Sequence, residues 1–334
     1  MTAQQQVYYR KWRPQRFGDV AGQEHVTHTL RQAVARGRIA HAYLFCGPRG
    51  TGKTSTARIL AKALNCLAPQ DGDPDDTCPP CVAITEGRFL GLIELDAASN
   101  RGIDEVRNIR EKARLAPSEG RCKVYILDEA HMLTEHAFNA LLTTLEEPPP
   151  HVVFVLCTTE PHKVPATIVS RCQRYDFRRL SPEVVVARLA HICAAEGLQA
   201  DGETLRAVAR AAGGSLRDAA NLLEQLAVSY GATLTVAQVH ELLGLVGSGH
   251  ALELVKHLAF ADAPGALALV NRLAWEGADM RQLHRQVVEL LRGLLLLQCG
   301  AREAVDLPAD ALQELSALAA RVPSPRVVRA LKLL

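Results

Sequence analysis

A chain of 334 residues exceeds one ordinary hydrophobic core, so we expect at least two domains. Its 38 lysines and arginines nearly balance 36 aspartates and glutamates, which excludes a global attraction to nucleic acid or membrane. The amino terminus has no apolar leader, and the longest apolar run, near 290–297, is far shorter than a membrane span. We therefore expect a soluble, cytoplasmic protein without membrane contact.

Four short apolar runs alternate with amphipathic segments in the first 180 residues. The runs span residues 42–46, 90–97, 123–130 and 152–159. Runs that are apolar at nearly every position are typical of parallel strands covered by helices on both faces. The sequence therefore predicts a doubly wound α/β domain over residues 1–180.

The first run leads into GPRGTGKT and then into a helical pattern. Glycines let such a loop wrap its N–H groups around phosphates, and the helix N-terminus adds partial positive charge. In this pattern Lys53 reaches the terminal phosphates and the Thr54 hydroxyl ligates Mg²⁺. The predicted phosphate-binding residues are Gly47, Pro48, Arg49, Gly50, Thr51, Gly52, Lys53, Thr54 and Ser55.

A cluster of metal-ligand side chains follows this helix. Cys66 precedes Cys78 and Cys81, which form a CxxC pair, and four aspartates lie between them. The CxxC spacing is typical of zinc sites, but a fourth cysteine is missing. The two alternatives are a zinc site with a carboxylate ligand and a pair of reduced thiols beside a solvated acidic loop.

The third run ends in adjacent acids, Asp128 and Glu129. At the carboxyl edge of a parallel sheet, Asp128 is placed to hold Mg²⁺ and Glu129 to orient a water toward a γ-phosphate. Together with the glycine-rich loop, this pair indicates a nucleoside triphosphatase.

Three further polar residues stand at the ends of apolar segments. They are Thr159, Arg171 and Arg217. Spacing alone favours ordinary interpretations, namely a strand-end hydroxyl and two surface arginines.

Beyond residue 183 the strand signal disappears, and helical patterns are punctuated by glycines at 197, 213, 214, 231 and 244. Glycines at such positions are typical of helix ends. We expect a small helical domain over 181–244 and a second helical region over 245–334. The final segment ends without a capping residue, so we expect a helix cut short.

Several motifs together resemble one known family. The motifs are RKWRPQRFGDVAGQEHV, GPRGTGKT, LDEAHMLTEHAFNALLTTLEEPP, SRC and GSLRDA. They are similar to those of the AAA+ clamp-loader ATPase subunits (gamma/tau) of bacterial DNA polymerase III, and the similarity is close over residues 7–245. The resemblance implies a P-loop AAA+ domain, a helical lid and a helical collar for oligomerisation.

The family's activity is also implied. Such ATPases form a pentameric ring with other clamp-loader subunits, open the sliding clamp with ATP and load it on primer–template DNA for the DNA polymerase III holoenzyme, a DNA-directed DNA polymerase. Two other interpretations of the function remain open. One is another AAA+ DNA-remodelling ATPase such as a branch-migration helicase, although the cysteine cluster and the TTLEEPP stretch disfavour it. A non-enzymatic clamp-loader scaffold is disfavoured by the intact Lys53, Thr54, Asp128 and Glu129.

The resemblance assigns roles to the ambiguous residues. Thr159 would sense the γ-phosphate, Arg217 would reach the nucleotide from the lid, and Arg171 would act as an arginine finger on the neighbouring subunit's ATP. The family segment around adenine and ribose matches Arg13, Val20 and Ala21.

The resemblance also implies which residues contact DNA and which bind zinc. Family positions that contact DNA phosphates correspond to Asn100, Arg107 and Lys163, although Asn100 replaces a residue that is often basic, and solvated surface charges are the alternative. The family binds zinc through four cysteines, three of which match Cys66, Cys78 and Cys81. The fourth position is Asp75 here.

Overall fold

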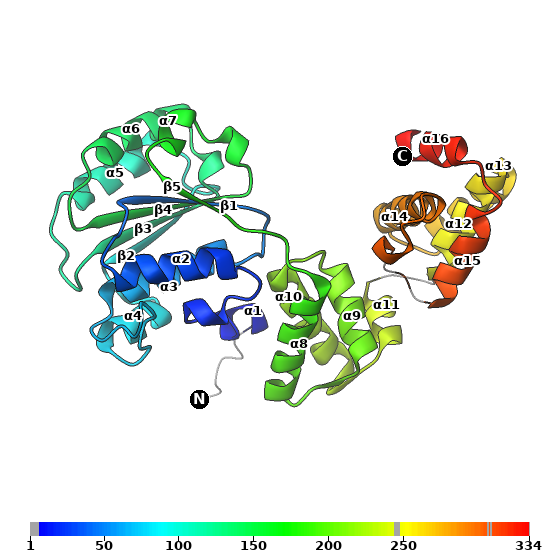
Figure 1. Ribbon diagram of the computed structural model, residues 1–334, viewed down its shortest axis with the longest axis horizontal. Coiled ribbons are helices and arrows are strands. Elements are labelled where there is room, and N and C mark those ends of the chain that lie inside the picture. Colours follow the sequence, from blue (N-terminus) through cyan, green and yellow to red (C-terminus); the bar gives the residue numbers. More distant parts are fainter. Residues whose placement is uncertain (1–6, 244–247, 306, 308, 334) are drawn as a thin grey trace. The chain divides into compact units, whose positions relative to one another are not determined.

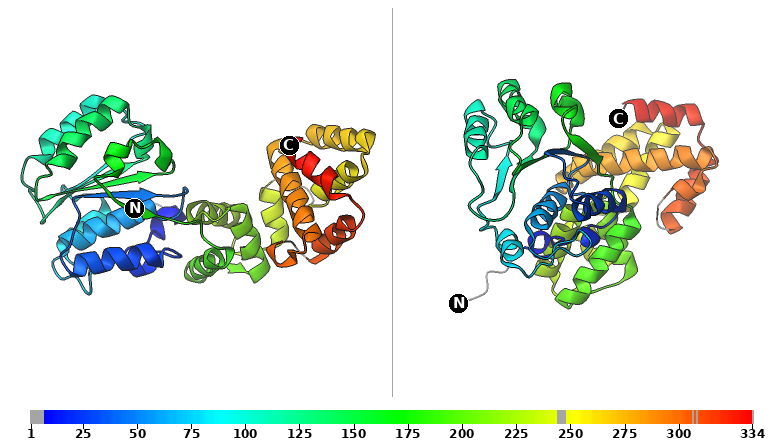
Figure 2. Two further views of the ribbon diagram at one scale, coloured as in Figure 1. Left: turned by 45° about the horizontal axis from the view of Figure 1, so that its top comes forward. Right: turned by 60° about the vertical axis from the view of Figure 1, so that its left-hand side comes forward.

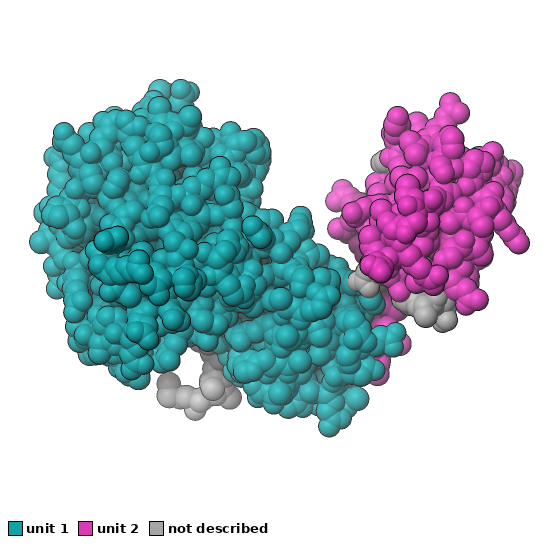
Figure 3. Space-filling model, in the orientation of Figure 1, with its two compact units in different colours: residues 1–234 teal, residues 235–334 magenta. Residues whose placement is uncertain are grey.

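The computed structural model describes residues 7–243, 248–305, 307 and 309–333. The chain divides into two compact units, residues 1–234 and 235–334 (Figure 3). The domain boundary expected at 244/245, including Gly244, lies outside the described residues.

A five-stranded parallel sheet forms the centre of the first unit, with strand order β2-β3-β4-β1-β5. The strands are β1 (Ala42–Cys46), β2 (Leu92–Asp96), β3 (Lys123–Asp128), β4 (Val152–Thr158) and β5 (Gln173–Asp176). The central strands β1 and β4 are buried at every position, as expected for a sheet covered on both faces. The four predicted strands are thereby confirmed.

Helices cover the two faces of this sheet (Figure 1). One face carries α2 (Glu24–Ala35) and α3 (Lys53–Asn65), and the other carries α5 (Ile103–Ala113), α6 (Glu135–Glu146) and α7 (Ala166–Val169). Alternate side chains of β1 enter the two separate cores: Tyr43 and Phe45 pack on the α3 side, and Leu44 packs on the α6 side. Both faces of the sheet are therefore buried by apolar contacts.

Short elements connect these layers. They are α1 (Tyr8–Lys11), η1 (Phe17–Asp19), α4 (Pro79–Glu86), η2 (Ala130–Met132) and η3 (Pro161–Lys163). The segment from Cys66 to Cys78 joins α3 to α4 and carries the acidic residues of the cysteine cluster.

The lid of the first unit consists of α8 (Pro182–Glu196), α9 (Gly202–Ala211) and α10 (Leu216–Tyr230). The side chains of Ser181, Asp201 and Ser215 cap the three helix N-termini by accepting backbone N–H groups. Gly197 ends α8 in the left-handed conformation, with φ of 71°. The predicted helices of this region are confirmed.

All the regular elements in the described part of the second unit are helices. Its elements are α11 (Val236–Leu242), α12 (Ser248–Phe260), α13 (Ala263–Trp275), α14 (Met280–Gln298), η4 (Arg302–Ala304), α15 (Ala309–Ala319) and α16 (Ser324–Leu333) (Figure 2). Leu283, Val287, Leu290 and Leu294 lie on one buried face of α14, with the spacing of an amphipathic helix. This helix forms the centre of the unit's core.

Two features differ from the sequence expectations. The edge strand β5 was not expected, because only Tyr175 of its four residues is buried. A two-stranded parallel pair, β6 (Gln199–Ala200) and β7 (Thr233–Leu234), lies in the lid, where no strand was expected. Among the described residues, no helix has the length and apolar character needed to cross a membrane.

Candidate functional site

The glycine-rich loop joins β1 to α3 and requires its glycines. Gly47, Gly50 and Gly52 have φ values of 143°, 74° and 103°, a region that favours glycine. A Cβ at Gly47 would lie 2.3 Å from the Phe177 carbonyl oxygen. The loop is therefore compatible only with residues that lack a side chain at these positions.

Lys53 begins α3 and turns back over the loop. Its Nζ donates to the carbonyl oxygens of Gly47, at 2.8 Å, and Pro48, at 2.7 Å. Burial lowers the pKa of Lys53, while the neighbouring carboxylates oppose this effect. The ammonium group thus lies against the carbonyl groups at the start of the loop, and its residue begins α3.

The two predicted magnesium ligands are in direct contact. The Thr54 hydroxyl donates to Asp128 Oδ2 at 2.7 Å, although 74 positions separate them in the chain. Asp128 ends β3, and its register partner is Asp96 at the end of β2. Hydroxyl and carboxylate oxygens in this arrangement are the hard ligands that Mg²⁺ prefers.

Glu129 and Thr159 also meet at this edge of the sheet. The Thr159 hydroxyl donates to Glu129 Oε2 at 3.0 Å. Glu129 has a left-handed φ of 47°, which is uncommon for a residue with a side chain.

His131 was missed by the sequence analysis. Its ring is buried, with Nδ1 3.1 Å from Thr158 Oγ1 and Nε2 3.3 Å from Glu160 Oε1. In the sequence, only its position two residues after Glu129 could have indicated that His131 lies at the site.

A cleft of about 400 Å³ lies over the loop, within the range of small-ligand sites. Arg13, Val20 and Ala21 line it from the N-terminal segment, and Arg217 lines it from α10. Burial lowers the pKa of Arg13. The predicted nucleotide residues from three distant parts of the chain therefore face one cleft.

Ten lining residues were not anticipated from the sequence. They are Tyr9, Trp12, Pro14, Asp19, Asp96, Ala98, Arg188, Ile192, Leu216 and Ala220. The Arg217 guanidinium lies 4.8 Å from the centre of the Tyr9 ring, in a cation–π contact. The positions of Tyr9, Trp12, Arg188 and Ile192 follow from contacts between the N-terminal segment and the lid, which local sequence patterns do not report.

Arg171 is not among the described residues that line this cleft. It follows α7, where its guanidinium donates to Glu146 Oε1 at 2.7 Å and to the Thr167 carbonyl at 2.8 Å. The side chain is about one-third exposed.

The three predicted DNA-contacting residues lie apart from the cleft lining. Asn100 follows β2 and donates to the Asp96 carbonyl at 3.1 Å. Arg107, on α5, and Lys163, on η3, are exposed, and each forms an ion pair three residues away, with Asp104 and Glu160 respectively. Surface pairs of this kind are weak and leave the cations available to phosphates.

The four predicted zinc ligands converge. The ligand atoms of Cys66, Asp75, Cys78 and Cys81 all lie within 4.8 Å of one another. The sulfur atoms of Cys66 and Cys78 are 3.9 Å apart, close to the about 3.8 Å expected between thiolates on a tetrahedral zinc. The residues present therefore fit a zinc ion.

The electrostatics of this cluster favour a cation. Burial raises the pKa of the Cys66 and Cys81 thiols, so a divalent cation is needed to stabilise their thiolates near neutral pH. Backbone N–H groups of Cys78 and Thr77 donate to Asp75 Oδ1, and they lower its pKa. Asp75 is therefore an ionised carboxylate, as a zinc ligand must be.

Comparisons with known proteins identify the family to which this chain belongs. Family models match residues 22–181 (DNA polymerase III, delta subunit), 184–233 (DNA polymerase III clamp loader subunit, ATPase lid domain) and 234–334 (DNA polymerase III subunits gamma and tau domain III). Solved structures of the Thermotoga maritima RuvB Holliday junction branch migration motor align at 17% identity with a TM-score of 0.53, covering 91% of this chain and 98% of theirs. That likeness concerns the AAA+ fold alone.

Relatives among characterised proteins are much more similar. DNA polymerase III subunit tau of Bacillus subtilis is 48% identical over 87% of this chain, and that of Escherichia coli is 44% identical over 88%. The chain spans about half of those two relatives, 52% and 46% of their lengths. DNA polymerase III subunit gamma of Buchnera aphidicola is 39% identical over 86% of this chain, and the match covers 79% of that relative's length. The chain belongs to the family of DNA polymerase III gamma and tau subunits.

Proposed function

We propose that this chain is the ATP-hydrolysing motor of a bacterial clamp loader, which opens a sliding clamp and loads it on primer–template DNA. The observation that carries the proposal is the contact between Thr54 and Asp128 at 2.7 Å, because it joins the phosphate loop to the acidic strand end in one cleft. The activity belongs in the cytoplasm, where the bacterial chromosome is replicated.

ATP binding follows from the loop. Its N–H groups and the α3 N-terminus bind the phosphates, and Lys53 exchanges its two carbonyl partners for phosphate oxygens. Thr54 and Asp128 would hold Mg²⁺, which neutralises charge on the β- and γ-phosphates. Arg13, Val20 and Ala21 line the part of the cleft assigned to adenine and ribose.

Hydrolysis uses the groups at the end of β3 and β4. Glu129 orients the attacking water, and the Thr159 hydroxyl, which donates to Glu129 Oε2 at 3.0 Å, would sense the γ-phosphate beside it. Arg217 lines the cleft from α10 of the lid and would contact the phosphates from there. ATP binding and lid position are therefore coupled.

Arg171 completes the site of a neighbouring subunit. It lies outside its own chain's cleft lining and is partly exposed, as an arginine finger acting in trans requires. Such a finger makes hydrolysis depend on assembly into a ring with other clamp-loader subunits.

DNA is bound through its phosphates by Arg107 and Lys163, with Asn100 as a weaker neutral contact. Phosphate contacts carry no sequence information, which suits a protein that acts at any primed site.

Zinc is bound by Cys66, Asp75, Cys78 and Cys81. The ion fixes the segment between α3 and α4, which has few apolar residues to form a core of its own.

The test is ATP turnover by the chain assembled with its partner subunits, measured with and without sliding clamp and primed DNA. Stimulation by clamp and primed DNA together supports the proposal. Stimulation by branched DNA without the clamp would instead indicate a branch-migration type of motor, and absence of ATP turnover in every assembly would indicate a scaffold.

A further inference from the structure

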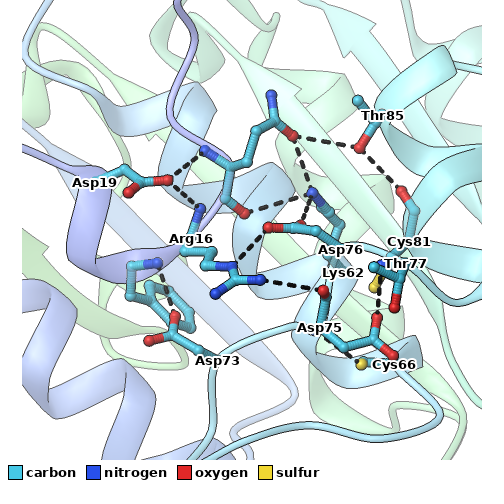
Figure 4. Close-up of polar contacts among 12 residues, drawn as sticks. Arg16, Asp19, Lys62, Cys66, Asp73, Asp75, Asp76, Thr77, Cys81 and Thr85 are labelled. Atoms are coloured by element: carbon cyan, nitrogen blue, oxygen red, sulfur yellow. Dashed lines mark hydrogen bonds and ion pairs between the residues drawn. The ribbon is translucent and has the colours of Figure 1, made fainter.

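The N-terminal segment is tied to the segment between the cysteines by a polar network (Figure 4). We call residues 7–21 the strap and residues 66–78 the acidic loop. The Arg16 Nε lies 2.8 Å from Asp76 Oδ2, and the Arg16 guanidinium also donates to the Asp75 carbonyl at 3.1 Å. The Phe17 N–H donates to Asp73 Oδ1 at 2.8 Å.

Lys62 joins this network to the helix of the phosphate loop. Its side chain on α3 is only 2% exposed, and it forms an ion pair with Asp76 and a hydrogen bond to Gln15 Oε1 at 2.9 Å. A buried ammonium group requires such partners, because an unpaired charge in this position is strongly unfavourable. Lys62 therefore holds the strap and the acidic loop on α3 together.

The acidic loop is itself held in place on α2. At Gly72, with φ of 86°, the loop backbone passes so close to α2 that a Cβ would lie 2.1 Å from the Arg31 carbonyl oxygen. The Arg31 guanidinium lies 3.6 Å from Asp73 Oδ2. The loop is thus a fixed support rather than a free appendage.

Apolar burial anchors the strap only at its C-terminal end, where Phe17 and Val20 pack into the core of the α3 side. None of its described residues from 7 to 16 is buried, and α1 has only four residues, too few to be a stable helix alone. Its contacts with the lid include hydrogen bonds from the Tyr8 N–H to Glu224 and from Trp12 Nε1 to Glu196. An ion pair between Lys11 and Glu196 and ring contacts at Tyr9 and Trp12 add to them. Between these two sets of contacts, Tyr9 and Arg13 line the nucleotide cleft.

We propose that Asp76, Arg16 and Lys62 are positioning residues for nucleotide binding: the acidic loop holds the strap so that Arg13 faces the nucleotide. This inference rests on the proposed ATP site. It gives the cysteine-containing insertion a role in nucleotide affinity, although none of the described residues from 66 to 81 lines the cleft.

The test compares ATP affinity of the full chain and its variants by equilibrium titration with a fluorescent ATP analogue. Asp76→Asn keeps the shape of the side chain and removes its charge, and Arg16→Gln changes an exposed residue that tolerates substitution. We expect each to weaken ATP binding about fivefold to tenfold, because the fraction of molecules with a correctly placed strap falls. Turnover at saturating ATP should stay within twofold of the wild type.

Measurements in the Arg13→Ala variant separate the proposed positioning role of Asp76 from a purely structural role. If Asp76 acts through Arg13, Asp76→Asn should change affinity by less than twofold when Arg13 is already alanine. The matched control is Arg88→Gln, which removes an exposed ion pair with Glu86 that does not reach the strap. It should leave ATP affinity unchanged.

The outcomes distinguish this inference from the proposed function. Equal ATP affinity in wild type and Lys53→Ala would overturn the ATP site itself. Tight, Lys53-dependent binding that is unchanged by both Asp76→Asn and Arg16→Gln would overturn only the role of the acidic loop. If Asp76→Asn lowers ATP affinity equally in the wild type and in the Arg13→Ala variant, the role of the acidic loop would also be overturned.

Discussion

Replacing Gly50 by alanine tests the contact between the phosphate loop and the lid. Gly50 has φ of +74°, and a Cβ there would lie 1.9 Å from Ser215 Oγ and 2.9 Å from Ser215 Cβ. The Gly50 carbonyl also accepts the Leu216 N–H at 3.1 Å. Since Ser215 caps α10, which carries Arg217, the added methyl group must displace the start of that helix or the loop itself.

Two costs add in this variant. The left-handed backbone costs an alanine about 1 kcal/mol, and the overlap with Ser215 costs about 1–3 kcal/mol more. For a unit of this size, 1 kcal/mol lowers the unfolding temperature by about 2–4 °C. We therefore expect Gly50→Ala to lower it by about 5–15 °C and to weaken ATP binding, because the lid residue Arg217 moves.

The matched control is Gly87→Ala. Gly87 has the same φ of +74°, but a Cβ there would meet nothing within 4 Å. This variant isolates the backbone cost, and we expect a decrease of about 2–4 °C with unchanged ATP affinity.

The measurements are thermal unfolding and equilibrium ATP titration of the three proteins. Adding Ser215→Gly to Gly50→Ala should recover most of the overlap cost, since glycine replaces a helix cap at a cost of only a few tenths of a kcal/mol. If Gly50→Ala and Gly87→Ala unfold at the same temperature, the loop and lid do not pack as described.

Three further predictions concern the proposed chemistry. Lys53→Ala should abolish tight ATP binding, whereas Glu129→Gln should keep binding and lower turnover by at least a hundredfold; equal turnover in Glu129→Gln and wild type would exclude Glu129 as the water-orienting group. Arg171→Ala should leave the isolated chain's ATP affinity unchanged and lower turnover only in the assembled ring, with Arg174→Ala as the surface control; loss without assembly would mean action within its own subunit. Protein purified without chelator should contain about one equivalent of zinc, and Asp75→Ala should contain less; under about a tenth of an equivalent in wild type would contradict the site.

Much of the site could be predicted from contiguous sequence. The residues from Gly47 to Thr54 work as one loop, so their order along the chain carries the geometry. Asp128 and Glu129 follow an apolar strand, and the end of a parallel strand is a defined place in the fold. The cysteine spacing likewise indicated convergence, and the structure places Asp75 beside the three sulfur atoms.

Other residues and elements could not be predicted from the sequence, because their local sequence pattern is weak or is the same as that of surface positions. The edge strand β5 has one buried residue, so its pattern does not differ from that of a loop. Tyr9 and His131 are ordinary side chains in sequence, and each gains its place through a contact, with Arg217 and with Glu160 respectively.

The sequence by itself determined most of the local structure, namely which segments are strands or helices, and it indicated the candidate residues for binding phosphate, water and metal. Only the tertiary structure decided which distant segments meet, as Gly50 meets Ser215, Trp12 meets Glu196 and Arg16 meets Asp76. The physical reason is that hydrophobic periodicity and loop chemistry act over a few neighbouring residues. Contacts between residues 60 to 184 positions apart arise only when the packed layers bring those residues together.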